Sequence, residues 1–429
     1  MARRLKQDGE RNFTAFMFTR VRGTQDILPQ DSFSWQEVEE GARRIFSLYG
    51  YQEIRTPILE KASLFNHSLG ETTEIVQKQM FEIKHSKDHL VLRPEGTVPV
   101  VRAFLENNLN KTKDAGKFYY IGPMFRAERP QKGRLRQFHH IGAEAIGSIS
   151  PYLDIEIISL SDRLLKEFGV KDYEIVLNSL GCSKDKAGFA EELRSRLKGR
   201  LAKLCPDCQK RYKRNVFRIL DCKNAACKKI ISSLSLTCDY LCSECRSHFE
   251  SVTRGLESIG ISCQLLPSLV RGLDYYTRTV FEIRHNRLGS QDALGAGGRY
   301  DNLVSRFAGG DTPAIGFAFG VERLLLARDH HCVPCARCLI YVIPLGQKAE
   351  EKCIQLLHSL RSNQIAADMD YSGRSLKAKM RQANEANAGF CVIIGENELA
   401  KGVVTLKNMA CGEQEEVKQE ELIEKIKNL

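Results

Sequence analysis

The stretch Arg271-Gly-Leu-Asp-Tyr-Tyr-Thr-Arg-Thr-Val-Phe-Glu282 is the most informative part of this 429-residue chain. Its β-branched and aromatic residues predict a strand over 269–283, with successive side chains on opposite faces. A purely structural strand rarely needs an arginine before a glycine and two tyrosines soon after it. The guanidinium, the phenols and the carboxylates therefore predict a pocket for an anionic group beside a flat polar ring.

A second concentration of charged and aromatic residues lies in a predicted hairpin, with strands at 117–126 and 136–146. The segment between them, Arg126-Ala-Glu-Arg-Pro-Gln-Lys-Gly-Arg-Leu-Arg136, is strongly basic. Alternation along the return strand places five residues on one face: Arg136, Phe138, His140, Gly142 and Glu144. Phe138 is suited to stack on a base, Arg126 to neutralise a phosphate and Glu144 to accept a ring N–H. The alternative is an edge hairpin whose charged tip prevents aggregation.

Two shorter segments complete the candidate pocket. Leu92-Arg-Pro-Glu-Gly-Thr97 leads into a predicted helix over 97–109 and puts Glu95 where it could bind an ammonium; an ordinary helix N-terminus is the alternative. Ala314-Ile-Gly-Phe-Ala-Phe-Gly-Val-Glu-Arg323 ends with an arginine at a helix start, which favours phosphate, although tight core packing would give a similar pattern. The chain has no G-x-x-x-x-G-K-[ST] phosphate loop, and we interpret 295–298 as a glycine-rich turn.

Composition and charge narrow the class of protein. The chain is 42% hydrophobic and 27% charged, as in ordinary globular proteins, and no apolar run has the length of a membrane span. The net charge of +11 is unevenly distributed, with 16 Lys/Arg against 8 Asp/Glu between Cys182 and Glu250. This concentration predicts a polyanionic partner such as nucleic acid, and a merely solvated surface is the alternative.

Fifteen cysteines without a secretory signal indicate a reducing compartment, and we expect a cytoplasmic location. Seven of them form the series Cys205-x2-Cys208, Cys222-x4-Cys227 and Cys238-x3-Cys242-x2-Cys245. Paired CxxC elements can supply four thiolates to structural Zn²⁺, with Cys205, Cys208, Cys242 and Cys245 as the candidate ligands. Reduced thiols without metal are an equal alternative, and no nearby His and Glu pattern favours catalytic zinc.

Local patterns divide the chain into parts. Residues 1–16 are expected to be a disordered extension, and 182–256 a cysteine-rich basic insertion within a larger domain, 17–331. A linker at 332–338 precedes an α/β domain at 339–429. The first helix is predicted at 34–49 from the capping box Ser34-x-x-Glu37, followed by a strand at 52–58. The remaining predicted elements are a helix at 154–168 and a strand at 172–178, then strands and helices at 339–345, 347–362, 374–388, 390–395, 403–408 and 416–428, the last a helix.

Together these segments resemble class II aminoacyl-tRNA synthetases, specifically the histidyl-tRNA synthetase family. The resemblance covers nearly all of 17–429, and its most specific parts are 271–282 and Gly297-Gly-Arg-Tyr-Asp301. Further resembling segments are Arg22-Gly-Thr-Gln-Asp-Ile-Leu-Pro29, the class motifs at 45–60, 120–144 and 314–326, and Gly373-Arg-Ser-Leu-Lys377 with Val392-Ile-Ile-Gly-Glu396 in the C-terminal domain.

The resemblance implies an α+β catalytic domain built on an antiparallel sheet, with a cysteine-rich insertion, plus a C-terminal α/β anticodon-binding domain. It implies a ligase that activates L-histidine with ATP and Mg²⁺, giving histidyl-adenylate and pyrophosphate. Histidine is then transferred to the 3′ end of its tRNA. The expected partners are histidine tRNA and a second copy of the chain in a homodimer, with no membrane.

Site roles carried over from the family fall on matching positions of this chain. Arg271 and Arg126 are the expected catalytic residues, and Arg129 and Gln131 the expected contacts to the tRNA acceptor end. ATP is expected to bind Arg126, Phe138 and Arg323. Histidine is expected to bind Glu95, Gly96, Thr97, His140, Glu144, Arg271, Tyr275 and Tyr276. One position departs from the pattern, because many relatives carry Gln where this chain has His140, which puts that contact with the substrate amino group in question.

Three different kinds of protein fit parts of the pattern. A regulatory subunit of ATP phosphoribosyltransferase resembles the catalytic domain but generally lacks an intact 271–282 segment and the C-terminal domain. A zinc-dependent RNA-binding protein would be organised around the cysteines and would not activate histidine. Synthetases for threonine, proline or glycine share the class motifs but not the 271–282 segment.

Overall fold

The computed structural model describes residues 18–70, 73, 75–83, 88–112, 116–289, 292–307, 310–329 and 339–428. The chain divides into two compact units, Met1–His331 and Cys332–Leu429. The predicted N-terminal extension and the predicted linker lie outside the described residues. No described helix combines the length and the apolar character that crossing a bilayer requires.

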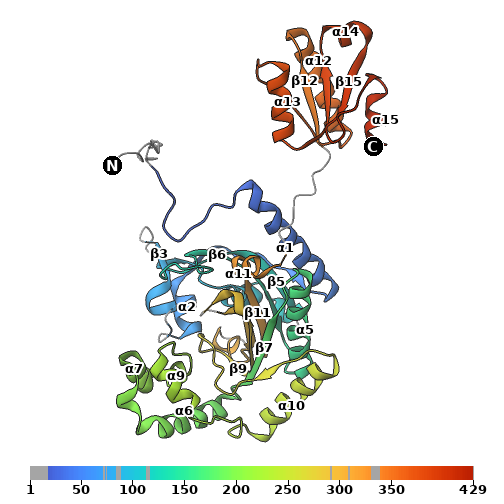
Figure 1. Cartoon of the computed structure of the whole chain (residues 1–429). Helices are drawn as coiled ribbons and strands as arrows, with labels where there is room; N and C mark the ends of the chain where they lie inside the picture. Colours follow the sequence, from blue (N-terminus) through green and yellow to red (C-terminus); the bar gives the residue numbers. More distant parts are fainter. Residues whose placement is uncertain are drawn as a thin grey trace, which may run out of the picture. The chain divides into compact units, whose positions relative to one another are not determined.

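The first unit is built on an eight-stranded sheet (Figure 1). In spatial order its strands are β1 (Gln52–Glu53), β5 (Gly116–Phe125), β6 (Gln137–Ile146), β11 (Ala314–Gly320), β10 (Ala293–Arg299), β9 (Thr277–His285), β7 (Tyr173–Ser179) and β8 (Gln264–Leu265). The six central strands are antiparallel, but β1 pairs parallel with β5 and β8 pairs parallel with β7. The sheet is therefore mixed, and the expected antiparallel arrangement holds for its central strands but not for the two edges. The strand expected at 52–58 is reduced to two residues, at an edge.

Four helices share one hydrophobic core with one face of this sheet: α1 (Pro29–Leu48), α5 (Pro151–Glu167), α10 (Ser243–Ser258) and α11 (Val321–Ala327). The predicted start of α1 at Ser34 is wrong, because the helix begins at Pro29. Proline suits the first helical turn, since its φ is already helical and its missing N–H is not needed there. The predicted apolar face is correct, with Trp35, Val38 and Ile45 buried.

A second core lies on the opposite face of the sheet. It includes α2 (Ala62–Leu69) and α3 (Thr97–Glu106), together with Val91 from a small antiparallel sheet. The remaining elements on the way to β5 are the small-sheet strands β2 (Leu59–Lys61), β3 (Phe81–Ile83) and β4 (Leu90–Leu92), the π-helix η1 (Ile75–Gln79) and the short α4 (Leu109–Thr112). Tyr275, Tyr276 and Val280 belong to this second core, whereas Phe281 of the same segment belongs to the first.

Two glycine- and arginine-rich stretches differ from their predicted structure. The strand β9 starts only at Thr277, and Arg278 has a left-handed φ of 43°, so alternation does not extend back to Tyr275. The stretch 295–298 is part of strand β10 and is not a turn. Its glycines are required by crowding, because a Cβ at Gly297 would lie 2.3 Å from the Gly316 carbonyl oxygen.

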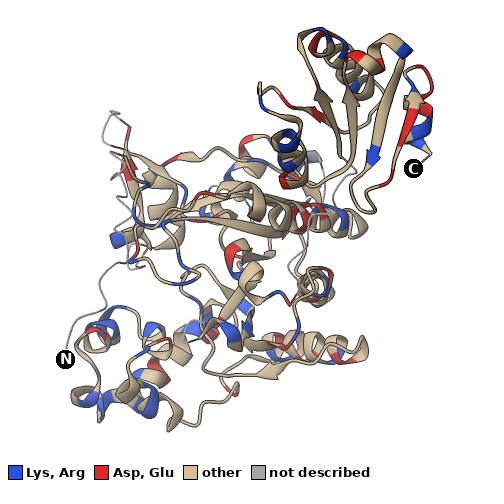
Figure 2. Ribbon diagram, turned by 45° about the horizontal axis from the view of Figure 1, so that its top comes forward, with Lys and Arg blue, Asp and Glu red and all other residues tan. Residues whose placement is uncertain are grey.

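Between β7 and β8 the chain is helical and basic. Its helices are α6 (Ser183–Lys198), α7 (Pro206–Arg214), α8 (Phe217–Leu220), α9 (Ala225–Ser232) and α10. Helices α6 to α9 enclose a small core of their own, in which Cys208, Cys222 and Cys227 are buried. Lys and Arg are frequent along these helices, at the lower left of Figure 2.

The second unit has its own five-stranded mixed sheet. In spatial order the strands are β13 (Ala367–Met369), β12 (Leu339–Pro344), β14 (Ala388–Ile394), β15 (Val403–Asn408) and β16 (Gln414–Lys418), and the helices are α12 (Gln347–Ser362), α13 (Leu376–Glu385), α14 (Glu396–Lys401) and α15 (Leu422–Lys427). The single helix predicted at 416–428 is wrong. Residues 414–418 instead form an edge strand that pairs with β15 and buries only Val417, and the helix follows it.

Candidate active site

A cavity of about 350 Å³ opens within the first unit and brings together segments far apart in the sequence. Its wall contains ten of the predicted site residues: Glu95, Gly96, Thr97, Arg126, Phe138, His140, Arg271, Tyr275, Tyr276 and Arg323. These residues come from the start of α3 and the two residues before it, from the residue after β5, from β6, from the segment before β9, and from α11. Glu144 lies behind the wall, whereas Arg129 and Gln131 are exposed near the tip of the β5–β6 connection and do not line the cavity.

Arg126, Arg271 and Arg323 all line this cavity. The Nε of Arg126 donates to the Pro94 carbonyl oxygen at 2.9 Å, and its guanidinium lies 5.1 Å from the centre of the Phe138 ring. Arg323 donates from Nε to the Gly133 carbonyl oxygen at 3.2 Å. Three fixed cations in one partly buried cavity are suited to hold a polyanion such as a triphosphate.

Arg271 is held by the strand that follows it. One of its terminal nitrogens forms an ion pair with Glu282, which also accepts from Arg284 at 2.7 Å. The Nε of Arg271 is buried and has no hydrogen-bond partner among the described residues. The side chain is 21% exposed, so it faces the cavity and not bulk solvent.

Glu95 serves as the cap of α3. Its two carboxylate oxygens accept from the backbone N–H groups of Thr97 and Val98, both at 2.9 Å. Burial raises the pKa of this carboxyl. Glu95 therefore caps the N-terminus of α3, as the alternative interpretation of this segment predicted, and the same carboxyl also lines the cavity.

Glu144 is fully buried beneath the cavity wall. Its Oε1 accepts from the hydroxyls of Thr97 at 2.7 Å and Tyr120 at 3.3 Å, and its Oε2 accepts from Tyr300 at 2.5 Å. Burial raises the pKa of Glu144 to about 8, although these three hydroxyls favour its charged form. A carboxylate offers about four acceptor positions, so this arrangement leaves capacity for one further N–H.

Glycine at 316 provides the room that Glu144 occupies. Gly316 pairs with Glu144 across neighbouring strands, and a Cβ at Gly316 would lie 1.8 Å from Glu144 Oε2. Gly96 and Gly142 make similar room for Tyr120, since added Cβ atoms would lie 2.3 Å and 2.5 Å from its ring. Thr97, Tyr120 and Tyr300 line the cavity and donate to Glu144 behind them, and together they form its polar floor. This polar floor therefore depends on positions that tolerate no side chain.

His140 is the departure from the family pattern, and its surroundings keep it neutral. Burial and then the nearby Arg126 and Arg93 lower the pKa of His140 to about 3. Its Nδ1 is buried and lacks a hydrogen-bond partner within the described part of the chain. The ring lies against Phe138 with centroids 5.1 Å apart. A neutral imidazole with an unused ring nitrogen can accept a hydrogen bond from an ammonium.

The helical region between β7 and β8 fixes the segment that carries Arg271. Lys186 donates to the Tyr276 carbonyl oxygen at 2.8 Å, and Arg218 donates to the Gly272 carbonyl oxygen at 2.7 Å. Asn215 donates to the Asp274 carboxylate at 2.9 Å. These contacts hold the backbone of 272–276 from outside, so the cavity wall depends on helices α6 to α8.

Several cavity residues were not predicted from the sequence. Tyr120 and Tyr300 support Glu144. Tyr300 lies within 297–301, which was among the most specific parts of the resemblance, but no role was predicted for any single residue there. Arg218, Asp221 and Lys223 line the cavity from the basic helical region. Charge alone assigned that region to nucleic acid, and only the folded arrangement reveals that part of it reaches the cavity.

The predicted set of zinc ligands does not form a single cluster. Cys205 and Cys208 lie with Cys222 and Cys227, whereas Cys242 and Cys245 lie with Cys182 and Asp185. The prediction joined cysteines from two different places because spacing along the chain cannot show which CxxC pairs meet. Each group offers four ligand atoms within 4.8 Å of one another.

Comparisons with known proteins agree on one family. The family model described as histidyl-tRNA synthetase matches residues 23–324, and an anticodon binding domain model matches 339–429. The histidine–tRNA ligase of Halothermothrix orenii is 46% identical over 413 residues, which is 95% of this chain and 98% of that protein. The corresponding ligase of Syntrophotalea carbinolica is 45% identical over 92% of this chain and 95% of its own length.

A solved structure supports the same conclusion. The apo histidyl-tRNA synthetase of S. aureus superposes with a TM-score of 0.79 at 34% identity, covering 96% of this chain and all of that one. This likeness extends over both units, and the family match spans the candidate cavity in the first of them. The chain belongs to the histidyl-tRNA synthetase family.

Proposed function

We propose that the cavity of the first unit is where this chain, a histidine–tRNA ligase, activates histidine and loads it onto tRNA. The proposal rests mainly on one observation: Arg126, Arg271 and Arg323 line the same cavity as a polar floor supported by Glu144. Three cations suit a nucleoside triphosphate, and the floor suits a small ligand with a polar ring. A zinc-dependent RNA-binding protein would need neither the three arginines nor the polar floor. A synthetase for threonine, proline or glycine would not need a floor that binds a polar ring.

In the first step the carboxylate of histidine attacks the α-phosphorus of ATP, and pyrophosphate leaves. This step needs no nucleophile from the protein, so positioning and charge neutralisation must lower the barrier. Arg126 holds the α-phosphate, Arg323 the γ-phosphate, and Phe138 stacks on adenine. Arg271 lies against the reacting carboxylate and stabilises the negative charge that develops there.

The amino group and the ring of histidine are recognised by different parts of the wall. The ammonium is bound by the Glu95 carboxyl and by the neutral ring of His140, whose unused Nδ1 can accept an N–H. The imidazole of the substrate uses the remaining acceptor capacity of Glu144 and the hydroxyl of Tyr276. An apolar ligand of the same size would leave these buried groups unpaired, which gives selectivity.

Mg²⁺ enters this site with ATP. Oxygen ligands suit this ion, and the carboxylates that line the cavity include those of Glu128, Glu282 and Asp292. Together with phosphate oxygens they would hold Mg²⁺, which would neutralise phosphate charge as pyrophosphate leaves.

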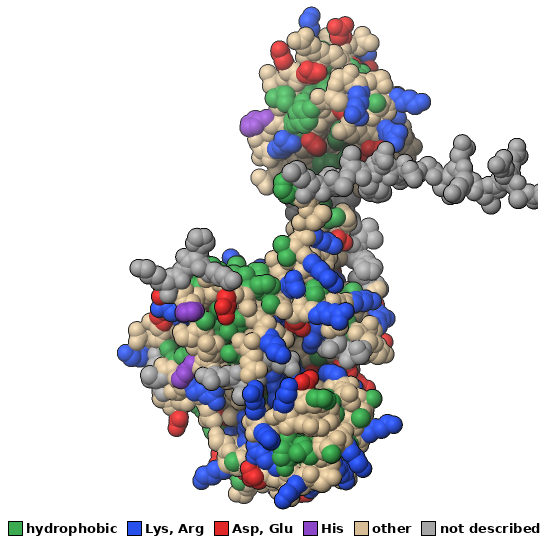
Figure 3. Space-filling view, turned by 90° about the vertical axis from the view of Figure 1, so that its left-hand side faces the viewer, with side chains coloured by type: hydrophobic (Ala, Val, Ile, Leu, Met, Phe, Trp, Pro, Cys, Tyr) green, Lys and Arg blue, Asp and Glu red, His purple; other side chains and the backbone are tan. Residues whose placement is uncertain are grey.

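In the second step a terminal ribose hydroxyl of the tRNA attacks the activated carbonyl, and AMP leaves. Arg129 and Gln131 contact the acceptor end, and their exposure at the tip of the β5–β6 connection leaves them accessible. Lys and Arg side chains over the lower part of the face in Figure 3 would bind the tRNA backbone. The second unit would bind the anticodon.

A homodimer would cover the apolar residues near β1. Leu48, Ile58 and Leu59 are 69%, 40% and 48% exposed, and they flank the short edge strand. They lie within 45–60, which resembles a class motif that is usually a dimer contact. Mass measured by light scattering should correspond to two chains, and a single chain at micromolar concentration would contradict this part of the proposal.

The direct test is amino acid-dependent exchange of pyrophosphate into ATP, measured with each amino acid in turn. Exchange should occur with histidine and stay at background with the others. Activation of an apolar analogue at a rate near that of histidine would refute the role given to Glu144 and Tyr276. Charging of tRNA, measured in parallel, tests the second step separately.

A further inference from the structure

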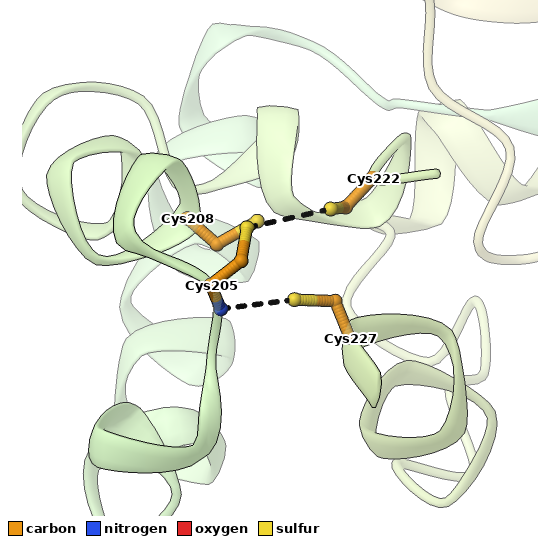
Figure 4. A group of neighbouring side chains, drawn as sticks. All are labelled: Cys205, Cys208, Cys222 and Cys227. Atoms are coloured by element: carbon orange, nitrogen blue, oxygen red, sulfur yellow. Dashed lines mark hydrogen bonds between the residues drawn. The ribbon is translucent and has the colours of Figure 1, made fainter. Parts of the chain in front are cut away.

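Four cysteines from three consecutive helices meet inside the basic helical region (Figure 4). Cys205 and Cys208 stand at the start of α7, Cys222 follows α8, and Cys227 lies in the first turn of α9. Cys208 and Cys227 are fully buried and Cys222 nearly so. Cys205 is partly buried and packs against the same small core, so the four side chains gather at that core.

Their spacing is that of a tetrahedral thiolate cage. The Sγ atoms of Cys205 and Cys222 are 3.8 Å apart, and all four lie within 4.8 Å of one another. Zinc bound by four thiolates has Zn–S distances of about 2.3 Å, so neighbouring sulfurs are separated by roughly 3.8 Å. A disulfide would need its two sulfurs at about 2.05 Å, so this pair lies at ligand distance and not at bonding distance.

The surroundings offset the charge that such a cage would carry. Zn²⁺ displaces the protons of the thiols, and four thiolates around it leave a net charge of about −2. The backbone N–H of Cys205 donates to the Cys227 sulfur at 3.2 Å, which stabilises a thiolate there. Between Lys203 and Lys229 the chain has nine Lys/Arg and only two Asp.

The region also needs a cross-link. Helices α7, α8 and α9 have nine, four and eight residues, too short to be stable alone, and the core that they share with α6 is small. Small cores of this kind are commonly completed by a structural metal. The four cysteines lie together where these three helices meet, beside apolar residues such as Ile219 and Ile231.

The second group, Cys182, Asp185, Cys242 and Cys245, differs from the four-cysteine cluster because it contains a carboxylate that already has partners. Asp185 accepts from the backbone N–H of Cys182 at 3.2 Å through one oxygen and from that of Cys242 at 3.1 Å through the other. Its carboxylate therefore already links the starts of α6 and α10, and this group is explained without a metal. Cys242 is exposed, so it supplies a control variant.

We propose that Cys205, Cys208, Cys222 and Cys227 bind one structural Zn²⁺, which holds α7, α8 and α9 together. None of the four cysteines lines the cavity, so the metal would act through the position of the helices. Asn215 and Arg218, between the two cysteine pairs, are the residues that hold Asp274 and Gly272 next to Arg271. Zinc thereby fixes the outer support of the cavity wall.

The test begins with the full-length protein purified without chelator. Elemental analysis should give about one zinc per chain, and cobalt grown into the site should show the absorption of a tetrahedral tetrathiolate. Cys208→Ser should lose the metal, whereas Cys242→Ser should retain it. Absence of zinc, or loss of zinc in Cys242→Ser with retention in Cys208→Ser, would overturn the proposal.

Wild-type protein provides a measurement that does not depend on a variant folding. Alkylation followed by mass spectrometry should find Cys205, Cys208, Cys222 and Cys227 protected until a mercurial releases zinc, while Cys242 reacts at once. A Cys205–Cys222 disulfide in place of protection would also contradict the assignment. Metal content is independent of histidine activation, so failure here would leave the ligase assignment intact.

Discussion

The cavity and the four-cysteine cluster both collect ionisable side chains, but they are built in opposite ways. The cavity draws on residues from Glu95 to Arg323, and burial displaces their pKa values while some polar atoms stay unused. The cluster is made within 23 residues, from Cys205 to Cys227, and its four groups face one another. The cavity therefore leaves polar atoms available to a ligand, whereas the four sulfur atoms of the cluster lie close enough together to share one metal ion. Changes in the cavity should therefore alter chemistry most, and changes near the cluster should alter positioning.

The largest effect is expected for Arg271→Ala. Removing a preorganised cation from the reacting centre should lower the rate of histidine activation by about a hundredfold to a thousandfold, or roughly 3–4 kcal/mol. Arg284→Ala is the matched control, because Arg284 also bonds Glu282 but does not line the cavity. Single-turnover adenylate formation measures both. A similar loss in the two variants would mean that Arg271 serves only to hold Glu282.

Gly316→Ala should have the next largest effect. The added methyl group would lie 1.8 Å from Glu144 Oε2 and 2.6 Å from the Ala143 carbonyl oxygen, so the floor must shift. Overpacking of this kind costs roughly 1–3 kcal/mol, which predicts about a tenfold to hundredfold rise in KM for histidine. Gly188→Ala on α6 is the control, because its Cβ would meet nothing within 4 Å. An unchanged KM would show that Glu144 is not near the substrate.

The pH dependence of histidine binding tests the ionisation of Glu144. Burial raises its pKa to about 8, so below that pH the carboxyl of the free protein is mostly protonated. If the substrate ring donates to the carboxylate, binding must release this proton. KM for histidine should then rise as pH falls from 8.5 to 7, by up to about tenfold per unit. Glu144→Gln should remove this slope and leave only the titration of the ligand, and a slope retained in Glu144→Gln would exclude Glu144 as its source.

The smallest effect is expected for Arg218→Ala, which touches both regions. Losing its hydrogen bond to the Gly272 carbonyl oxygen should cost about 1.5 kcal/mol and lower histidine activation roughly tenfold. Lys213→Ala removes the same charge from an exposed position on α7 and should change little. If zinc acts through Arg218, the loss of histidine activation caused by Arg218→Ala should be smaller in zinc-depleted protein than in zinc-loaded protein. If the effects of Arg218→Ala and of zinc depletion on histidine activation were fully additive, zinc would not act on the cavity through Arg218.

Local rules predicted much of the fold. The bounds of α12 and β15 were correct because their helical spacing and alternation are uninterrupted. The strand β16 was missed because Gln414-Glu-Glu-Val-Lys418 has a single apolar residue and gains its structure from pairing with β15. The start of β9 was misplaced because Arg271 to Tyr276 are held by Lys186 and Arg218, which come from a distant helical region.

The site shows the same division between local and long-range information. Ten predicted residues line one cavity because the resemblance carried their positions, and no local rule would have brought Glu95 near Arg323. The three hydroxyls around Glu144 come from α3, β5 and the segment after β10, so its hydrogen-bond donors could not be anticipated from sequence. The cysteines were recognised as candidate ligands, but only folding shows which of them meet.

The pairing of Gly316 with Glu144 has an evolutionary consequence. Any larger residue at 316 collides with the carboxylate, and any shorter residue at 144 abandons three hydroxyl groups at once. Single substitutions at either place should thus be harmful on their own. If Glu144 binds the substrate as proposed, a descendant that accepted a different amino acid would need replacements at both positions together.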